Sequence, residues 1–192
     1  MTGECYASMC APHAEASIFH TDQGERVHIR DVVPHDTPLL TDLLFRLSNE
    51  TRWLRYFSAG PLSFERAWLE ATRMAQRCTH DRAALVATIR RGDAEEAIAV
   101  AEVVRDQRTA TVGELAIVVR DDYQMHGIGS ALGGQLVQIA RATGITTVRA
   151  EIQFENRVAQ RLMRRVFGSS SATRHGSVVE MMAQVSNAIS NG

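Results

Sequence analysis

The chain has 192 residues, a formal net charge of -1, 45% hydrophobic residues and 22% charged residues. These values are typical of a globular protein with one core, and they argue against nucleic-acid binding by phosphate neutralisation. No stretch is long and apolar enough to span a membrane, and the first residues lack the pattern of a signal peptide. The three cysteines, Cys5, Cys10 and Cys78, are not spaced as a metal site, so we expect a cytoplasmic protein without a bound metal.

The first part of the chain is expected to form a tail, one strand and two helices. Residues 1–24 are mostly small and polar, which predicts a flexible tail. Glu25–Val33 alternates apolar and polar residues, as a half-buried strand does, and Pro34 ends the alternation. Leucines at helical spacing predict a first helix that runs to Leu47, and a second helix is expected to begin after Ser63.

The segment between these helices, residues 48–57, is rich in aromatic residues and arginine. Aromatic side chains of this kind most often pack in a core, so we interpret Trp53, Tyr56 and Phe57 as core residues and the arginines as solvated. The alternative is that the segment borders a binding site.

The rest of the chain alternates strands and helices without an internal repeat. The order is one strand, two helices, three strands in hairpins and then a strand–helix alternation. It predicts an α+β fold with a mixed, mostly antiparallel sheet and about four helices. We expect a single domain over residues 25–186 and a C-terminal tail over 187–192. The expected strands are Ala83–Ile89, Ala97–Val104, Thr109–Val119, Thr147–Ile152 and Gly176–Val185, the expected helices are 128–142 and Asn156–Phe167, and Ser169–Arg174 is expected to be a loop.

A glycine-bearing loop joins the strand that ends at Val119 to the helix that begins near Ile128. Gly127 and Gly129 allow the backbone to approach a ligand closely, and the unpaired N–H groups at a helix N-terminus favour an anion. The spacing therefore predicts a phosphate or pyrophosphate site. Leu132 stands where a dinucleotide fingerprint needs a third glycine or alanine, and a Gly-Lys-Ser/Thr loop is absent. An ordinary strand-to-helix turn is the alternative.

An acidic residue in an apolar strand marks a second candidate site. Glu114 stands three residues before Ile117, where an acidic side chain needs a specific reason. A carboxylate held in a cleft can serve as a general base. The alternative is a surface glutamate paired with an arginine. Glu102, on the preceding expected strand, is the second candidate, and it could share a water with Glu114 if the two strands pair.

The strand, loop and helix together resemble the pyrophosphate loop of the GCN5-related N-acetyltransferase (GNAT) superfamily, in the pattern Gln-x-x-Gly-x-Gly-Ser-Ala of residues 124–131. Within the superfamily, residues 47–57 and 114–124 are similar to bacterial protein lysine acetyltransferases of the Pat type. The resemblance covers roughly residues 27–185. It implies the GNAT fold, in which the fourth and fifth strands splay apart and the pantetheine arm of acetyl-CoA lies in the gap.

The resemblance also implies roles for individual residues. Glu114 would be the general base. Backbone groups of Ile117 and Val119 would pair with the pantetheine arm like an added strand, and the amides of residues 125–130 would hold the pyrophosphate. His126 lies inside this loop and is interpreted as a loop residue, not as a base.

Two further positions follow from the motif Asn156-x-x-Ala159-x-x-Leu162. Asn156 matches the cofactor-facing asparagine of the superfamily, and a helix N-cap is its alternative or additional role. Met163 stands where many members have a tyrosine that acts as general acid, but a thiol of pKa about 8.5 leaves readily without one. The expected cofactor-binding residues are Ile117, Val118, Val119, Gln124, Met125, His126, Gly127, Ile128, Gly129, Ser130, Asn156 and Met163.

The resemblance implies an acetyl-CoA-dependent N-acetyltransferase that acts on a protein lysine, for example of an acyl-CoA synthetase. The alternatives are a GNAT enzyme for a small amine (a polyamine, amino acid or antibiotic), a non-catalytic acetyl-CoA-binding module, and a nucleotide-dependent oxidoreductase. No metal, nucleic acid or membrane partner is expected, and the protein is expected to be a monomer or homodimer. Many Pat-type enzymes carry a ligand-sensing domain. Residues 1–24 are too few to form one, so we expect an unregulated activity.

Overall fold

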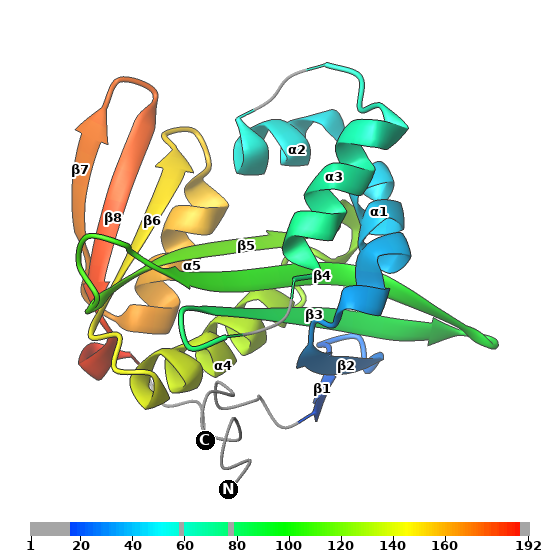
Figure 1. Ribbon diagram of the computed structural model, residues 1–192, viewed down its shortest axis with the longest axis horizontal. Helices are drawn as coiled ribbons and strands as arrows, with labels where there is room; N and C mark the ends of the chain where they lie inside the picture. Colours follow the sequence, from blue (N-terminus) through cyan, green and yellow to red (C-terminus); the bar gives the residue numbers. More distant parts are fainter. Residues whose placement is uncertain (1–15, 58–59, 77–78, 189–192) are drawn as a thin grey trace, which may run out of the picture.

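The computed structural model describes residues 16–57, 60–76 and 79–188. They form an eight-stranded sheet in the order β1-β2-β3-β4-β5-β6-β8-β7 (Figure 1). Neighbouring strands are antiparallel except β5 and β6, which confirms the expected mixed, mostly antiparallel sheet. The strands are β1 (Ser17–His20), β2 (Arg26–Asp31), β3 (Arg82–Arg91), β4 (Ala94–Arg105), β5 (Val112–Val119), β6 (Thr147–Gln153), β7 (Ser171–His175) and β8 (Val178–Gln184).

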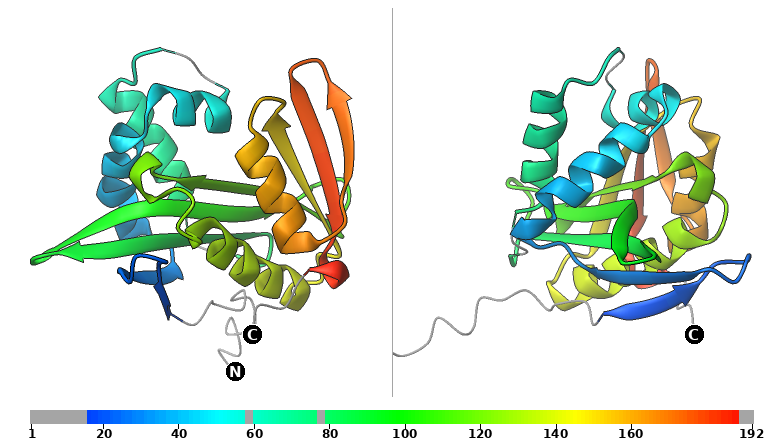
Figure 2. Two further views of the ribbon diagram at one scale, coloured as in Figure 1. Left: turned by 180° about the vertical axis from the view of Figure 1, so that it is seen from behind. Right: turned by 90° about the vertical axis from the view of Figure 1, so that its right-hand side faces the viewer.

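Helices cover both faces of the sheet. One apolar cluster joins the sheet to α1 and α3, and a second joins it to α4 and α5. The view from behind in Figure 2 shows α4 and α5 together on the face opposite α1 and α3. The α-helices of the described chain are α1 (Thr37–Arg46), α2 (Asn49–Tyr56), α3 (Phe64–Met74), α4 (Ile128–Ala142) and α5 (Arg157–Phe167).

Helix α2 is the one that the sequence did not predict. Ser48 begins it as the N-cap, because its Oγ accepts a hydrogen bond from the Thr51 amide at 3.0 Å. The helix buries Thr51 in place of an apolar side chain, so the periodicity that marks the other helices is missing. The interpretation of Trp53 and Phe57 as core residues is wrong, since they are 37% and 39% exposed, whereas Tyr56 packs against the α1–α3 cluster.

The expectation of a tail up to residue 24 is wrong for its last part. Ser17–His20 forms β1, which pairs with β2 in antiparallel register. Phe19 packs against the core, and Gln135 of α4 donates to the Ser17 hydroxyl at 2.6 Å. A strand of four residues is too short for its alternation to be detected, and these contacts with distant residues hold it in place.

A second strand was also missed. The expected loop Ser169–Arg174 overlaps the edge strand β7 (Ser171–His175), which pairs with β8. Every residue of β7 is exposed, so no alternation of apolar and polar residues could mark it. Backbone pairing with β8 creates the strand.

Candidate functional site

The site is organised around the place where β5 and β6 separate. The two strands pair in parallel register at three positions, of which Glu114 opposite Arg149 is the last. Beyond it β5 runs on beside β4 to Val119, while β6 runs on beside β8 to Gln153. The structure therefore confirms the expected splay of the two strands, which leaves the edge of β5 free of β6 above Glu114.

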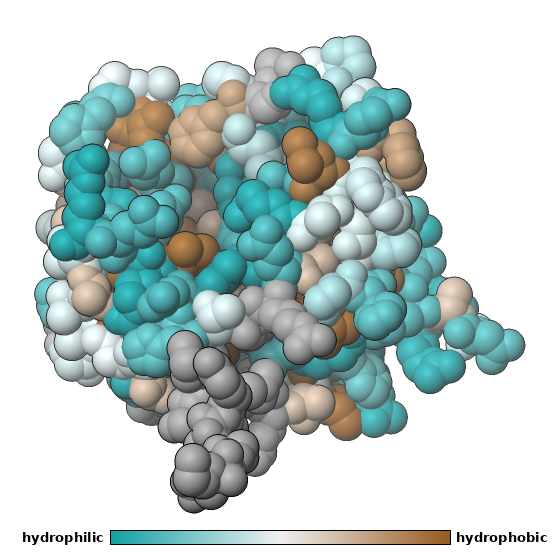
Figure 3. All heavy atoms as spheres, in the orientation of Figure 1, coloured by the Kyte–Doolittle hydropathy of each residue, from teal (hydrophilic) through white to brown (hydrophobic). Residues whose placement is uncertain are grey.

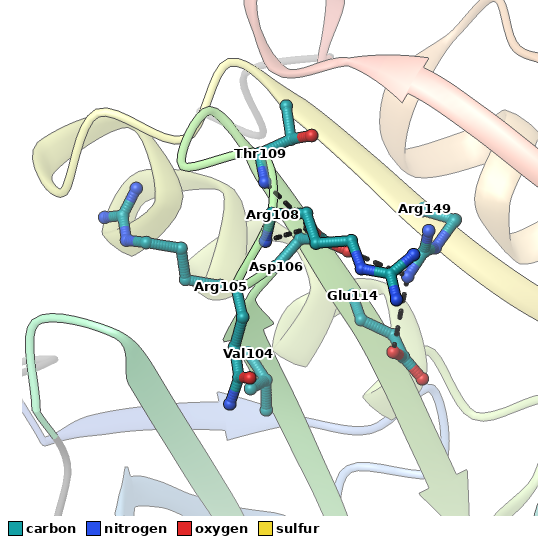
Figure 4. A pocket seen from close by; sticks show the side chains of 8 residues that line it. Val104, Arg105, Asp106, Arg108, Thr109, Glu114 and Arg149 are labelled. Carbon is teal, nitrogen blue, oxygen red and sulfur yellow. Dashed lines mark hydrogen bonds and ion pairs between the residues drawn. The ribbon is translucent and has the colours of Figure 1, made fainter.

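Glu114 is an exposed carboxylate at the base of this fork. Its side chain is 57% exposed, and its Oε2 lies 3.8 Å from Nη2 of Arg149. The same guanidinium donates to Asp106 at 3.3 Å, so Arg149 is shared between two carboxylates (Figure 4). The cavity around Glu114 has a volume of about 560 Å³. Its walls are Val104, Arg105, Asp106, Gln107, Arg108, Thr109, Glu114 and Arg149.

Glu102 is in a different situation. It lies on the same face of the sheet, diagonal to Glu114 in the β4–β5 register, but it is only 7% exposed. Its carboxylate accepts from Arg55 at 3.2 Å, from Arg73 at 3.0 Å and from Arg82 at 3.0 Å. Burial by itself raises the pKa of Glu102, but the hydrogen bond and charge of Arg73 and the charges of the other two arginines outweigh it, so the pKa lies below its ordinary value. Glu102 thus joins α2 and α3 to the sheet and is poorly suited to accept a proton.

The free edge of β5 offers backbone groups to the gap. The Arg120 amide donates to a carbonyl of β4 at 2.8 Å. Since hydrogen-bonded residues alternate along an antiparallel ladder, Val118 also faces β4, whereas the N–H and C=O groups of Ile117 and Val119 face the gap. The Val119 carbonyl accepts from the Gln124 side chain at 3.1 Å. The side chain of Val118 is buried in the α1–α3 cluster, so it does not face the gap.

The loop after β5 presents unpaired amides at the start of α4. Met125 and Gly127 adopt left-handed backbone conformations, with φ of 66° and 84°. The first helical hydrogen bond of α4 runs from Ala131 to the Gly127 carbonyl at 3.0 Å. Among the described residues, none accepts a hydrogen bond of good geometry from the amides of residues 125–130. These donors and the helix dipole together fit an anion such as a pyrophosphate.

The glycines of this loop also serve packing, which the sequence did not reveal. A Cβ on Gly127 would lie 2.9 Å from the Phe19 ring of β1, and a Cβ on Gly129 would lie 3.1 Å from Leu162 of α5. Gly127 thus combines a left-handed conformation with a close contact to β1, and Gly129 allows α4 to approach α5. Phe19 is a supporting residue that the sequence gave no signal for, because it lies in the segment expected to be a tail.

Other expected site residues lie at the margins of the loop. Met125 is 74% exposed, and the His126 ring stands edge-on to Tyr123 with a centroid distance of 6.4 Å. Asn156 is the N-cap of α5, since its side chain accepts from the Ala159 amide at 3.0 Å. Met163 is 4% exposed and belongs to the core on the α4–α5 side, so its side chain packs there and is not open to solvent.

The described residues contain neither a candidate metal site nor a membrane-spanning helix. Within the described ranges, no group of three or more His, Cys, Asp and Glu residues gathers in a way that could hold a metal ion. All three cysteines, Cys5, Cys10 and Cys78, lie outside the described residues. None of the described helices is long and apolar enough to cross a membrane.

Comparisons with known proteins agree with this geometry. The sequence profile of the acetyltransferase (GNAT) family matches residues 49–168, which run from α2 through α5. This range includes Glu114 and residues 124–130, which are called the Gly127 loop below. Acetyltransferase Pat of Mycolicibacterium smegmatis is 32% identical over 143 residues, which cover 74% of this chain and 41% of Pat. The chain therefore spans less than half the length of this curated relative.

Solved structures show the same fold. The GNAT domain of Streptomyces lividans PAT superposes with a TM-score of 0.75 at 23% identity, covering 88% of this chain and 96% of that domain. A cAMP-binding acyltransferase from Mycobacterium smegmatis superposes with a TM-score of 0.59 at 27% identity, covering 89% of this chain and 47% of that protein. The extent of the profile match and the identity to Pat decide the assignment. This chain belongs to the acetyltransferase (GNAT) family.

Proposed function

We propose that this chain is an acetyl-CoA-dependent N-acetyltransferase whose acceptor is a protein lysine. The observation that carries the proposal is the position of Glu114, an exposed carboxylate where β5 and β6 separate, on the strand whose free edge leads to the Gly127 loop. The 32% identity to Pat supports an acceptor of the same class. A protein acceptor such as an acyl-CoA synthetase is therefore the first to test.

The described residues fit acetyl-CoA as a co-substrate. The unpaired amides of residues 125–130 would hold its pyrophosphate at the N-terminus of α4. The backbone groups of Ile117 and Val119 that face the gap would pair with its amide-bearing arm in the manner of an added strand. Asn156 would border the arm from the start of α5.

In the proposed reaction the amine nitrogen attacks the thioester carbonyl carbon, a C–N bond forms, the C–S bond breaks, and CoA leaves as the thiolate. Glu114 takes the first proton of the ammonium, directly or through one water, and the second N–H proton passes to solvent or to the CoA thiolate as the tetrahedral intermediate collapses to the amide. Arg149 has a second carboxylate in Asp106, at 3.3 Å against 3.8 Å for Glu114. An incoming ammonium can thus take the place of Arg149 at Glu114 without leaving the guanidinium unpaired. With Met163 in the core, a thiol of pKa about 8.5 leaves without a dedicated acid.

The test is thiol release from acetyl-CoA in the presence of an acyl-CoA synthetase or of a panel of small amines. The expected result is thiol release with the acyl-CoA synthetase and not with the small amines, together with an acetyl group located on a lysine of the synthetase by mass spectrometry. Release with a small amine alone would keep the co-substrate and overturn the acceptor. Binding of acetyl-CoA without release by any acceptor would indicate a binding module in place of an enzyme.

A further inference from the structure

Helix α2 lies across the fork but is weakly anchored by its own packing. It contacts both β5 and β6, and in Figure 1 it stands between α3 and the β6–β8–β7 part of the sheet. Its buried residue is Thr51, and the remaining side chains are half-buried or exposed. The surface of this side of the molecule is mainly hydrophilic in Figure 3, with apolar residues in small groups. Directed polar contacts must therefore set the position of α2.

The contact at the N-terminus of α2 is a single carboxylate that belongs to the loop. Asp121, two residues after β5, accepts from the Ser48 amide at 2.9 Å, from the Ser48 hydroxyl at 2.6 Å and from the Thr51 hydroxyl at 2.7 Å. Both carboxylate oxygens are used, and hydrogen bonds to an ionised group are the strong kind. Burial alone raises the pKa of Asp121, but the hydrogen bonds from Ser48 and Thr51 outweigh it and lower the pKa below its ordinary value, so the group is charged at pH 7.

A second link joins the same residues to the edge of β5. The Gln124 side chain donates to the Thr51 hydroxyl oxygen at 3.2 Å and to the Val119 carbonyl at 3.1 Å. Gln124 directly precedes the unpaired amides, and Val119 is the last residue of β5. Through Gln124, Thr51 is thus linked to the start of the Gly127 loop and to the edge of β5 that faces the gap.

The rest of α2 is held by one contact on each side of the fork, to the turn after β6 and to β4 beside β5. Trp53 donates from Nε1 to Glu155, in the turn between β6 and α5, at a long 3.5 Å, and Arg55 pairs with Glu102 at 3.2 Å. A change in the loop that moved Asp121 would therefore tilt α2 relative to β6.

We propose that Asp121 is a positioning residue that couples occupancy of the Gly127 loop to the placement of α2 over the fork. Through Asp121 and Thr51, a loop ordered by acetyl-CoA fixes the helix that walls the acceptor side. The inference rests on the proposed function in one respect, namely that acetyl-CoA binds at this loop.

Hydrogen exchange of the α2 amides tests the coupling without an acceptor. Acetyl-CoA is expected to slow exchange in residues 49–56 of the wild type about tenfold, the effect of one charge-assisted hydrogen bond on a local opening equilibrium. Asp121→Asn should abolish this slowing while calorimetry still detects acetyl-CoA binding. Asp122→Asn is the matched control, because it makes the same change at the next residue. The carboxylate of Asp122 binds Arg120 and not α2. This control should behave like the wild type.

Thr51→Val provides a second variant that keeps the shape of the side chain and removes both of its polar links. It should also lose the slowing of exchange. Two outcomes with bound acetyl-CoA would refute the coupling and leave the proposed function standing. Either acetyl-CoA slows hydrogen exchange in α2 equally in the wild type and in Asp121→Asn, or it does not slow exchange in the wild type. If acetyl-CoA does not bind to the wild type, the proposed function itself is refuted, and the inference falls with it.

Discussion

Replacing Glu114 by glutamine tests the proposed base, because the change removes the charge and keeps the size of the side chain. General bases contribute about 10²–10⁴ in rate. The 57% exposure of Glu114 allows water to take over part of its task, so we expect a loss in kcat/KM near the lower end, about 100-fold, or about 2.7 kcal/mol at pH 7. Binding of acetyl-CoA should be unchanged, since Glu114 lies at the opposite end of β5 from the Gly127 loop.

The pH dependence gives the sharper test. A lysine amine of pKa about 10.4 is deprotonated in roughly one molecule in 2,500 at pH 7, and this fraction rises tenfold per pH unit. The defect of the variant should therefore shrink as the pH is raised toward 10, because a neutral amine no longer needs a base. Thiol release with a fixed protein acceptor, measured from pH 7 to 10, follows it.

Glu151→Gln is the matched control for this experiment, since it makes the same change on an exposed residue of β6. It should leave the rate unaltered. Full activity of Glu114→Gln at pH 7, or a defect that stays constant up to pH 10, would refute the assignment of the base.

Three further predictions concern stability and ionisation. Glu102→Gln should lower the free energy of unfolding by about 2 kcal/mol in urea at pH 7, because it removes the buried carboxylate that pairs with the half-buried guanidinium groups of Arg55 and Arg82. Since the folded pKa of Glu102 is lowered, this stabilisation is present above the ordinary pKa of about 4.3 and is lost as the pH falls below it; a difference that persists in full at pH 3 would contradict the role. Gly127→Ala should weaken acetyl-CoA binding and destabilise the fold more than Gly144→Ala, because Gly144 has a similar φ but no atom near the position of a Cβ. Adding Phe19→Ala to Gly127→Ala should recover part of the loss. Equal effects of the two glycine variants in calorimetry would contradict the close contact. Burial raises the pKa of Tyr56 to about 12, so ultraviolet titration should show a tyrosine step near pH 12 that Tyr56→Phe removes, and its presence near pH 10 would be inconsistent with burial.

The elements with strong periodicity were predictable from the sequence. The alternation before Pro34, the leucine stripe of α1 and the change from an apolar strand to helical spacing around Ile128 each reflect the face that the element buries. The parallel pair β5–β6 followed from the strand–helix–strand order, and the chain order placed Glu114 near the start of β5 and the Gly127 loop after its end. These features depend on residues that are close in sequence, so a single pattern contains them.

Other features depend on residues far apart in the chain, and the tertiary structure alone decided them. The N-terminus of α2 is held by Asp121, 73 residues after Ser48, which accepts hydrogen bonds from the Ser48 amide and hydroxyl. The edge strands β1 and β7 are held by pairing with a neighbour and not by burial of their own side chains. Glu102 and Glu114 looked alike in sequence, both acidic residues in apolar strands. Three arginines from other elements neutralise the first, and the separation of β5 from β6 leaves the second open to solvent. Local periodicity fixes which face an element buries, and packing between distant segments fixes the environment of each charge.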